Sequence, residues 1–384
     1  MVSDHAQRLM AMQSDAMRNN MKILAILSFL DGDRASKPLE ELQHAQHKSS
    51  WSRWIPFVVL HAPFLMLFAV GWSWQAVALC VVLYLIRMFA ITGFYHRYFS
   101  HRTFKTSRVL QFIFGVIGAT SVQRGPLWWA AHHRGHHRYS DKELDVHSPV
   151  VSGLVWSHIG WITSDKNIPT DYSRVPDLAK FPELVFLNRF DWLPVVILAV
   201  SVFAYGQYLH GFDSRVTGAQ LLVWGFVSTI ILFHATCSIN SFGHLIGSRR
   251  FDTDDDSRNN PVLALFTLGE GWHNNHHRFP GSTKQGIMWW EFDATYEVLK
   301  LMQSVGLVWE ISKANYDPSA CSASDDGVSR RPLLSQDSEV GVPLRHQLSQ
   351  DGGAVLARSH PVELSSVQFN SQMEAGARSG YGDV

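Results

Sequence analysis

Histidine stands out in this sequence because eight of its imidazoles fall in three short clusters. The first cluster is His96 and His101, and the second is His-Arg-Gly-His-His at 133–137. The third, His-Asn-Asn-His-His at 273–277, repeats the spacing of the second. Residues at i, i+3 and i+4 share one face of a helix, so we expect each triplet to direct several imidazoles at one point.

Such a set of imidazoles is suited to metal binding. Neutral imidazole is the commonest nitrogen ligand for metals in proteins and binds iron, zinc and copper. His244, which follows Asn240 by four residues at the end of an apolar stretch, adds a ninth candidate. One closed zinc site needs four ligands, so nine candidates fit two metal ions with open coordination positions better. A lone histidine usually has a structural role, but clustering on this scale favours metal binding.

The elements that must position these histidines are apolar and long. Three stretches contain no Asp, Glu, Lys or Arg: 55–86, 192–212 and 216–248. A membrane-spanning helix needs about 20 apolar residues. The first stretch predicts a helical hairpin over 55–71 and 76–95, and the other two predict a second hairpin that turns near 211–213. Buried helices of a soluble protein are the alternative, but long uncharged runs with Trp near their ends favour a membrane.

Basic residues indicate how the hairpins are oriented. Those next to the predicted spans are Lys48, Arg53, Arg97, Arg102, Lys105, Arg108, Lys180, Arg189, Arg249 and Arg250, whereas the turns carry only Arg215. By the positive-inside rule, both termini and the polar regions 96–191 and 249–318 are cytoplasmic. The apolar runs 109–123 and 153–163 are too short to span and fit the membrane interface. The predicted fold is an all-α integral membrane protein with four transmembrane helices in two hairpins and a cytoplasmic helical cap that holds a histidine-ligated dimetal site.

Composition excludes several other classes of protein. The 384 residues include 33 basic and 33 acidic ones, so no net positive field favours nucleic acid. The three widely spaced cysteines exclude a disulfide scaffold, a cysteine zinc site and a cysteine-ligated iron–sulfur cluster. All 14 tryptophans lie between Trp51 and Trp309. We therefore expect three parts: an N-terminal cytoplasmic segment (1–50) with a candidate amphipathic helix at 21–30, a membrane domain (51–317) and a disordered polar tail (318–384).

The histidine clusters and their flanks resemble those of the membrane-bound fatty acid desaturases. The matching segments are YHRYFSHRTFK at 95–105, WWAAHHRGHHRYSD at 128–141, NSFGH at 240–244 and GEGWHNNHHRFP at 269–280. They are most similar to the delta-9, acyl-CoA desaturase-like branch, and the resemblance covers about 50–312. It implies that nine histidines bind two non-haem iron ions: His96, His101, His133, His136, His137, His244, His273, His276 and His277. It also implies that Asn240 contacts one iron through water and that His132 is not a ligand.

The activity implied by the resemblance is a dioxygen-dependent desaturation. A cis double bond, at delta-9, would be introduced into a saturated acyl chain carried on CoA or a phospholipid, with no catalytic side chain beyond the metal ligands. No haem-binding, ferredoxin or nucleotide-binding module is evident, so electrons must come from a separate ferredoxin, rubredoxin or b-type cytochrome with its reductase. Two alternatives stay open: a related diiron fatty acid hydroxylase or alkane monooxygenase, and a non-enzymatic metal-binding or transport protein of the membrane.

Several further residues are candidates for supporting roles. Asp141, Asp145 and Glu270 lie near the ligands in sequence and could orient the imidazoles, although solvated charges are an equal alternative. Residues at helical spacing before His96, together with two tryptophans, could form an acyl tunnel: Tyr84, Leu85, Phe89, Trp128 and Trp129. Animal acyl-CoA members carry Arg-Asp where this chain has Ala131-His132, which leaves the acyl carrier open. Five basic residues could meet phosphates of CoA or of lipids: Arg97, Arg102, Lys105, Arg249 and Arg250.

Overall fold

The computed structural model of the chain describes residues 30–34, 42 and 48–314, and these are mostly helical. Their only strands are β1 (Lys105–Thr106) and β2 (Val308–Trp309), which pair antiparallel with Lys105 opposite Trp309. The amphipathic helix expected at 21–30 lies outside the described residues except for Leu30, and the tail expected at 318–384 lies wholly outside them.

Four apolar helices are long enough to cross a membrane. They are α3 (Trp51–Val70), α4 (Trp74–Phe89) with its continuation η1 (Ala90–Ser100), α11 (Trp192–His210), and α12 (Gly218–Ser241) with its continuation η5 (Phe242–His244). The connections at 71–73 and 211–217 are short, so each pair forms a hairpin close to the expected limits. The prediction of an all-α protein with four membrane helices in two hairpins is therefore confirmed.

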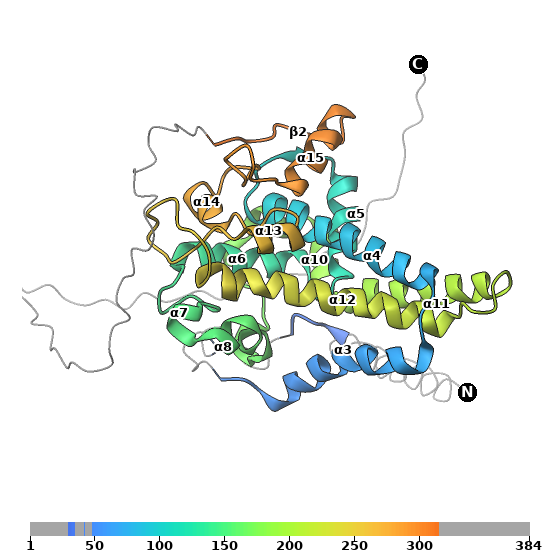
Figure 1. Cartoon of the computed structure of the whole chain (residues 1–384). Coiled ribbons are helices and arrows are strands. Elements are labelled where there is room, and N and C mark those ends of the chain that lie inside the picture. The colour runs from blue at the N-terminus through green and yellow to red at the C-terminus, as the bar shows by residue number, and fades with distance from the viewer. Residues whose placement is uncertain (1–29, 35–41, 43–47, 315–384) are drawn as a thin grey trace, which may run out of the picture. The chain divides into compact units, whose positions relative to one another are not determined.

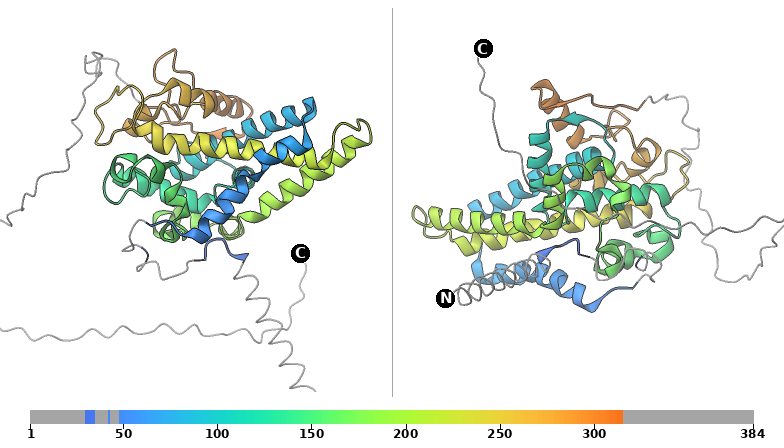
Figure 2. Two further views of the ribbon diagram at one scale, coloured as in Figure 1. Left: turned by 60° about the horizontal axis from the view of Figure 1, so that its bottom comes forward. Right: turned by 180° about the vertical axis from the view of Figure 1, so that it is seen from behind.

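Helix α12 is the centre of the membrane part and packs against α3, α4 and α11 (Figures 1 and 2). Its contact with α11 is close because Gly206 of α11 faces Gly218 of α12. A Cβ added to Gly206 would lie 2.7 Å from the Gly218 Cα. Small residues allow this approach between membrane helices. Buried Arg87 of α4 donates hydrogen bonds to the hydroxyls of Ser228 (2.7 Å) and Thr229 (2.6 Å) on α12, which provides polar partners for its buried guanidinium.

The cap consists of short elements around the ends of η1 and α12 (Figure 1). They are α5 (Arg108–Ala119), α6 (Pro126–Tyr139), α7 (Pro149–Ser152), α8 (Leu154–His158), η2 (Gly160–Thr163), η3 (Asp165–Asn167), η4 (Tyr172–Arg174), α9 (Pro176–Ala179), α10 (Pro182–Arg189), α13 (Pro261–Phe266), α14 (His273–Arg278) and α15 (Ala294–Ser304). The short apolar runs expected at 109–123 and 153–163 correspond to α5 and to α8 with η2.

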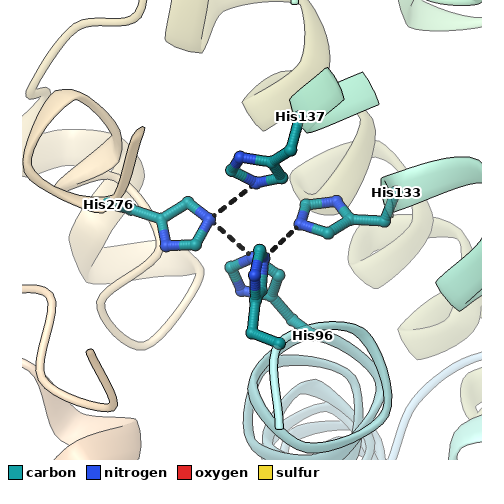
Figure 3. Close-up of side chains that lie close together, drawn as sticks. His96, His133, His137 and His276 are labelled. Carbon is teal, nitrogen blue, oxygen red and sulfur yellow. Dashed lines mark hydrogen bonds between the residues drawn. The ribbon is translucent and has the colours of Figure 1, made fainter. Parts of the chain in front are cut away.

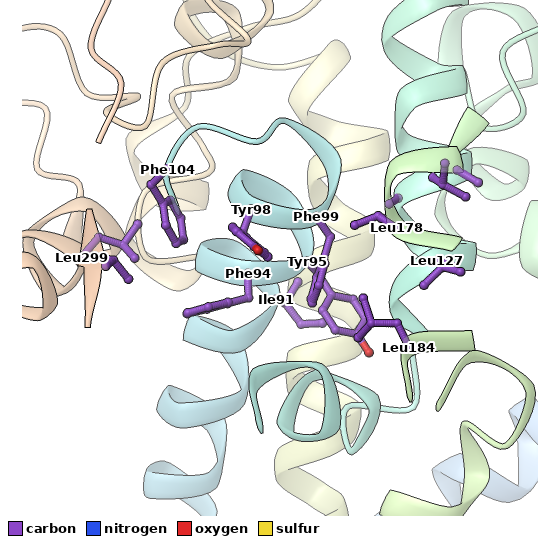
Figure 4. Close-up of a cluster of buried hydrophobic side chains, with 14 of the residues drawn as sticks. Ile91, Phe94, Tyr95, Tyr98, Phe99, Phe104, Leu127, Leu178, Leu184 and Leu299 are labelled. Carbon is purple, nitrogen blue, oxygen red and sulfur yellow. The ribbon is translucent and has the colours of Figure 1, made fainter. Parts of the chain in front are cut away.

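Aromatic side chains pack around η1, which is a π-helix, and hold it in place (Figure 4). Phe94, Tyr95 and Phe99 are fully buried, and the ring of Phe94 stacks on Phe114 with the centroids 3.9 Å apart. Stacked and edge-on aromatic pairs stabilise a core beyond the area that they bury. His96 lies within this segment, so the same packing fixes the backbone from which its imidazole projects.

The contact between η1 and α5 gives a test of this packing. A Cβ on Gly118 would lie 2.2 Å from Cε1 of Tyr95, whereas one on Gly281 would meet no atom within 4 Å. We expect Gly118→Ala to lower the free energy of unfolding by about 1–3 kcal/mol through overpacking, and Gly281→Ala to leave it unchanged. Thermal unfolding of the two variants in detergent measures the difference. Equal melting temperatures would contradict the close contact.

Candidate metal centre

The first histidine cluster depends on the π-helical form of η1. With 3.6 residues per turn, residues five apart in an α-helix point in directions roughly 140° apart. In η1 the His101 N–H donates a hydrogen bond to the His96 carbonyl at 3.2 Å, a bond that closes a wider turn. The two imidazole centroids are consequently only 4.9 Å apart. Helical spacing alone did not predict this meeting.

The nine histidines separate into two groups, and within each group the ligand nitrogens lie within 4.8 Å of one another. Group one is His96, His101, His133, His137 and His276, of which Figure 3 labels four; group two is His136, His244, His273 and His277. Each triplet is therefore divided, because residues at i and i+4 face one group while the remaining one faces the other. Two imidazoles of each triplet thus meet at one point while the third faces the other group, so α6 and α14 each contribute to both groups.

The atoms that converge are Nε2 nitrogens. In group one the Nε2 atoms of His101 and His133 are 2.8 Å apart. The Nε2 of His276 lies 3.0 Å from that of His96 and 2.9 Å from that of His137. In group two the Nε2 of His273 lies 3.1 Å from those of both His244 and His277. An N–H can bridge one such pair of nitrogens, but several nitrogens that converge on one point repel one another unless a cation lies between them. The donor set therefore fits two metal ions.

Carboxylates hold the opposite nitrogen, Nδ1, of four of these imidazoles. The pairs are His96 with Glu270 (2.5 Å), His136 with Asp145 (2.9 Å), His244 with Asp141 (2.8 Å) and His277 with Asp255 (2.6 Å). A carboxylate accepts a hydrogen bond from Nδ1–H, which keeps the proton on Nδ1 and leaves a lone pair on Nε2. The three carboxylates predicted from the sequence, Asp141, Asp145 and Glu270, thus each contact an imidazole. Their role in metal binding is a proposal.

Asp255 is the carboxylate that sequence reasoning missed. It lies in the loop between η5 and α13, where it accepts hydrogen bonds from the Ser257 backbone N–H (3.1 Å) and hydroxyl (2.6 Å) besides that from His277. Burial opposes its ionisation, but the hydrogen bond from His277 keeps its pKa well below the usual range. The sequence signal that could have indicated Asp255 is the acidic run DTDDD at 252–256.

A buried network of ion pairs and hydrogen bonds restrains Glu270. Arg97 donates to Glu270 at 2.9 Å and contacts Asp293 at 3.0 Å, and Gln285 donates to the second Glu270 oxygen at 2.9 Å. Burial alone would raise the pKa of Glu270, but the charges of His96 and Arg97 lower it to about 2. Glu270 is therefore an anion at neutral pH and a firm acceptor for the His96 N–H.

Six of the imidazoles are held neutral by their surroundings. Burial, followed by the neighbouring imidazoles, keeps the pKa of five of them well below the usual value: His101, His133, His137, His273 and His276. Burial also lowers the pKa of His277 to about 4. Burial alone would lower the pKa of His136, but the charge of Asp145 raises it. Neutral imidazole is the form that binds metals.

Three nearby polar residues lie outside the two groups. His132 directs Nδ1 at the Trp128 carbonyl (2.9 Å), which agrees with its omission from the candidate ligands. Asn240 lies between the cavities described below and lines both. His147, which the sequence did not single out, is buried beside Asp145 and His136, and the three could form a further small metal-binding group.

Two cavities reach the histidines. The larger, of about 270 Å³, extends from Phe57 and Leu60 of α3 past Trp128 and Trp129 to His133. The smaller, of about 40 Å³, is lined by apolar residues of α4 and η1 and by histidines of both groups.

Three predicted tunnel residues line neither of these two cavities. Tyr84 donates to the Phe266 carbonyl, Leu85 is 46% exposed, and Phe89 packs edge-on against Phe94. Met88 and Ile91 line the smaller cavity instead. The reason is the change from α-helix to π-helix at Ala90. The prediction counted back from His96 with α-helical spacing, whereas the wider π-helical turns bring a different face of α4 into line with His96.

The five basic residues considered for phosphate binding all form ion pairs within the chain. The pairs are Arg97 with Glu270 and Asp293, Arg102 with Asp177, Lys105 with Glu310, Arg249 with Asp252 and Arg250 with Glu291. Exposed pairs such as that of Lys105 are weak and exchange readily. Arg97 is only 1% exposed, and its charge is engaged in ion pairs with Glu270 and Asp293.

Comparison with known proteins agrees with this geometry. A family model described as fatty acid desaturase matches residues 72–309. Acyl-CoA 5-desaturase AL21 of Anemone leveillei is 37% identical over 66% of this chain and 74% of its own length. The sn-2 palmitoyl-lipid 9-desaturase of Nostoc is 35% identical over 68% of this chain and 90% of its own length. Delta-9 acyl-lipid desaturase 1 of Arabidopsis thaliana is 32% identical over 69% of this chain and 82% of its own length. On this evidence the chain belongs to the fatty acid desaturase family.

Proposed function

We propose that this protein is a dioxygen-dependent desaturase that introduces a cis double bond, at delta-9, into a saturated fatty acyl chain. The observation that carries the proposal is the pair of imidazole groups, each with its nitrogens within 4.8 Å, in a chain of the desaturase family. The delta-9 position is supported by two of the relatives described above, whereas the third is a delta-5 enzyme.

Two non-haem iron ions are the metals we propose. Group one would hold one ion and group two the other, with Asn240 contacting one of them through water. Iron of this kind supplies the reductive activation of dioxygen, which is strong enough to remove hydrogen from unactivated methylenes. The carboxylates on the Nδ1 side orient the imidazoles and balance part of the metal charge.

The protein's own part in the reaction is positioning. The acyl chain would lie along the larger cavity, between Trp128 and Trp129 of α6 and the apolar residues of α3, with its reacting carbons near His133. Apolar walls exclude water from this path and fix which methylene pair approaches the metals. The same placement decides between loss of a second hydrogen and hydroxylation, so a diiron hydroxylase is the alternative outcome of the test below.

A membrane lipid is the acyl carrier that we propose ahead of CoA. One wall of the larger cavity is α3, in which no residue is buried, so the cavity adjoins the lipid-facing side of the helices. Arg97, Arg249 and Arg250 form ion pairs within the chain, and Ala131-His132 stands where acyl-CoA members have Arg-Asp. Each of the five basic residues considered for phosphate binding thus already has a carboxylate partner within the chain.

We further propose the orientation and the extent of the catalytic unit. The histidine side would face the cytoplasm, since the basic residues gather there and the turn at 211–217 carries only Arg215, which pairs with Asp213. Electrons would come from an external ferredoxin, rubredoxin or b-type cytochrome with its reductase. Residues 51–317 would suffice for the reaction.

Expression in a host that lacks its own desaturase tests the function. We expect mass spectrometry of the lipids to detect monounsaturated chains with a cis delta-9 bond, and His133→Ala to abolish them because group one loses a ligand. A chain that ends at Pro318 should give the same product. Hydroxylated chains would contradict desaturation, and full activity of His133→Ala would contradict the metal assignment.

The role of Asp255 predicts a change in metal affinity. Asp255→Asn replaces the anionic acceptor of the His277 N–H with a neutral and weaker one, so we expect iron to bind about 10–100-fold more weakly, as is typical when the carboxylate partner of a ligating histidine is lost. Iron retained per chain after dialysis against a graded chelator measures this. The matched control is Asp252→Asn in the same loop, whose side chain is 93% exposed. Equal iron retention in the two variants would exclude the proposed role.

The acyl carrier is tested by a pulse of isotopically labelled saturated fatty acid in the same host. If a lipid carries the substrate, the labelled double bond should appear in phospholipid before it appears in acyl-CoA. Both pools can be followed by mass spectrometry of the same extracts. Labelled unsaturated acyl-CoA that precedes unsaturated phospholipid would assign the reaction to CoA instead.

A further inference from the structure

Helix α13 of the cap is short and apolar, yet its outer side is not covered by protein. The eleven residues 259–269 around it carry no charged side chain. An apolar stretch of this length is typical of a buried core helix or of a segment at a membrane interface. Val262, Leu265 and Phe266 are exposed, Leu265 to 73%, so the core-helix explanation does not apply.

A neighbouring loop continues this exposed apolar surface. Leu245 and Ile246 follow η5, and both side chains are exposed. The side-chain amide of Asn260 donates a hydrogen bond to the Ile246 carbonyl at 3.2 Å, which joins the loop to the start of α13. We call the five exposed residues the α13 patch: Leu245, Ile246, Val262, Leu265 and Phe266.

The α13 patch adjoins two of the membrane-spanning helices. Helix α13 packs against α12 near its end (Figure 1). Tyr84, an interior residue of α4, donates a hydrogen bond to the Phe266 carbonyl. The next two residues of α4, Leu85 and Ile86, are exposed and apolar, as expected on the lipid-facing side of a spanning helix. The patch therefore continues a surface that lipid covers, which a water-soluble partner could not reach without displacing that lipid.

The two ends of α13 have the hydrogen bonds that a lipid environment requires. The first N–H groups and last carbonyls of a helix lack partners within it, and in lipid they need partners from elsewhere in the protein. The Asn260 side-chain oxygen accepts from the N–H groups of Val262 (3.0 Å) and Leu263 (3.2 Å). Tyr84 supplies the donor for the Phe266 carbonyl at the other end.

We propose that the α13 patch inserts into the lipid leaflet on the histidine side of the membrane and anchors this part of the cap to the bilayer. The partner is the membrane itself, with phospholipid acyl chains around the five apolar side chains. Burial of apolar side chains at the acyl boundary is the term that holds interfacial segments to a membrane. The anchor is therefore a second contact between cap and membrane, in addition to the spanning helices from which the cap extends.

Exposed tryptophans near the patch support a membrane interface. Gly271 packs against Ala264 of α13, and the ring of the next residue, Trp272, lies 5.6 Å from that of Trp290. Trp290 and its neighbour Trp289 are both exposed. Indole rings are enriched at membrane–water interfaces because they combine an apolar body with a polar N–H.

The anchor is joined closely to the segment that carries the third histidine cluster. A Cβ on Gly271 would lie 2.1 Å from the backbone nitrogen of Ala264, so α13 lies directly against the turn that precedes α14. Insertion of α13 thereby sets the distance of this turn from the bilayer. A consequence for the acyl chain follows only if the proposed function holds, whereas insertion itself does not depend on it.

Labelling from within the lipid tests the insertion on the unaltered protein. The full-length chain is placed in phosphatidylcholine nanodiscs that contain a lipid with a photoactivated diazirine in its acyl chain, and adducts are located by peptide mass spectrometry. We expect residues 261–266 to be labelled about as strongly as residues 81–86 of α4. The control is Leu144, 63% exposed in the polar loop between α6 and α7, where labelling should be severalfold lower. Labelling of 261–266 no stronger than that around Leu144 would overturn the proposal.

A matched pair of substitutions tests the contribution of the patch. Leu265→Asp places a carboxylate where it is costly in lipid, so labelling of 261–266 should fall severalfold while labelling of 81–86 is retained. Leu144→Asp should change neither. Undiminished labelling of 261–266 in Leu265→Asp would contradict insertion of this side chain. Neither measurement uses desaturation or bound iron, so failure of the anchor and failure of the proposed function are distinguishable.

Discussion

The rest of the structure depends on crowding nine imidazoles together with their Nε2 atoms facing inward. Group one and group two each hold their nitrogens within 4.8 Å, an arrangement that a cation between them would stabilise. From outside, four carboxylates accept hydrogen bonds from the Nδ1–H groups and orient the rings. The carboxylates are themselves restrained, as Glu270 is by Arg97 and Gln285.

The membrane helices supply the rigidity that this crowding needs. The η1 and η5 segments continue α4 and α12 out of the apolar core, and α12 packs against three other long helices, so the ligands on these two segments start from a well-fixed base. Aromatic packing around Phe94 and Tyr95 fixes η1 further. Helix α3 differs from the other three because it has no buried residue, and its His61 contacts His234 of α12 at 2.8 Å.

Much of the site followed from residue types and spacing. Uncharged runs of membrane-spanning length predicted the four helices, and the clustered histidines predicted a metal centre, because both signals are local in sequence. Asp255 was not predicted, since its loop lies 22 residues from His277 and an acidic run is usually solvated. Tyr84, Leu85 and Phe89 were misplaced because the extrapolation assumed a single helical period through Ala90.

By itself, the sequence determined the number of membrane helices, their pairing in hairpins and the identity of the nine histidines, because hydrophobic length and ligand type are properties of short segments. Only the tertiary structure decided how the triplets divide between the two groups, which carboxylate holds which imidazole, and that His61, His158 and His234 meet. These outcomes depend on the rotation and packing of elements far apart in the chain, such as α3 against α12, which no local pattern specifies.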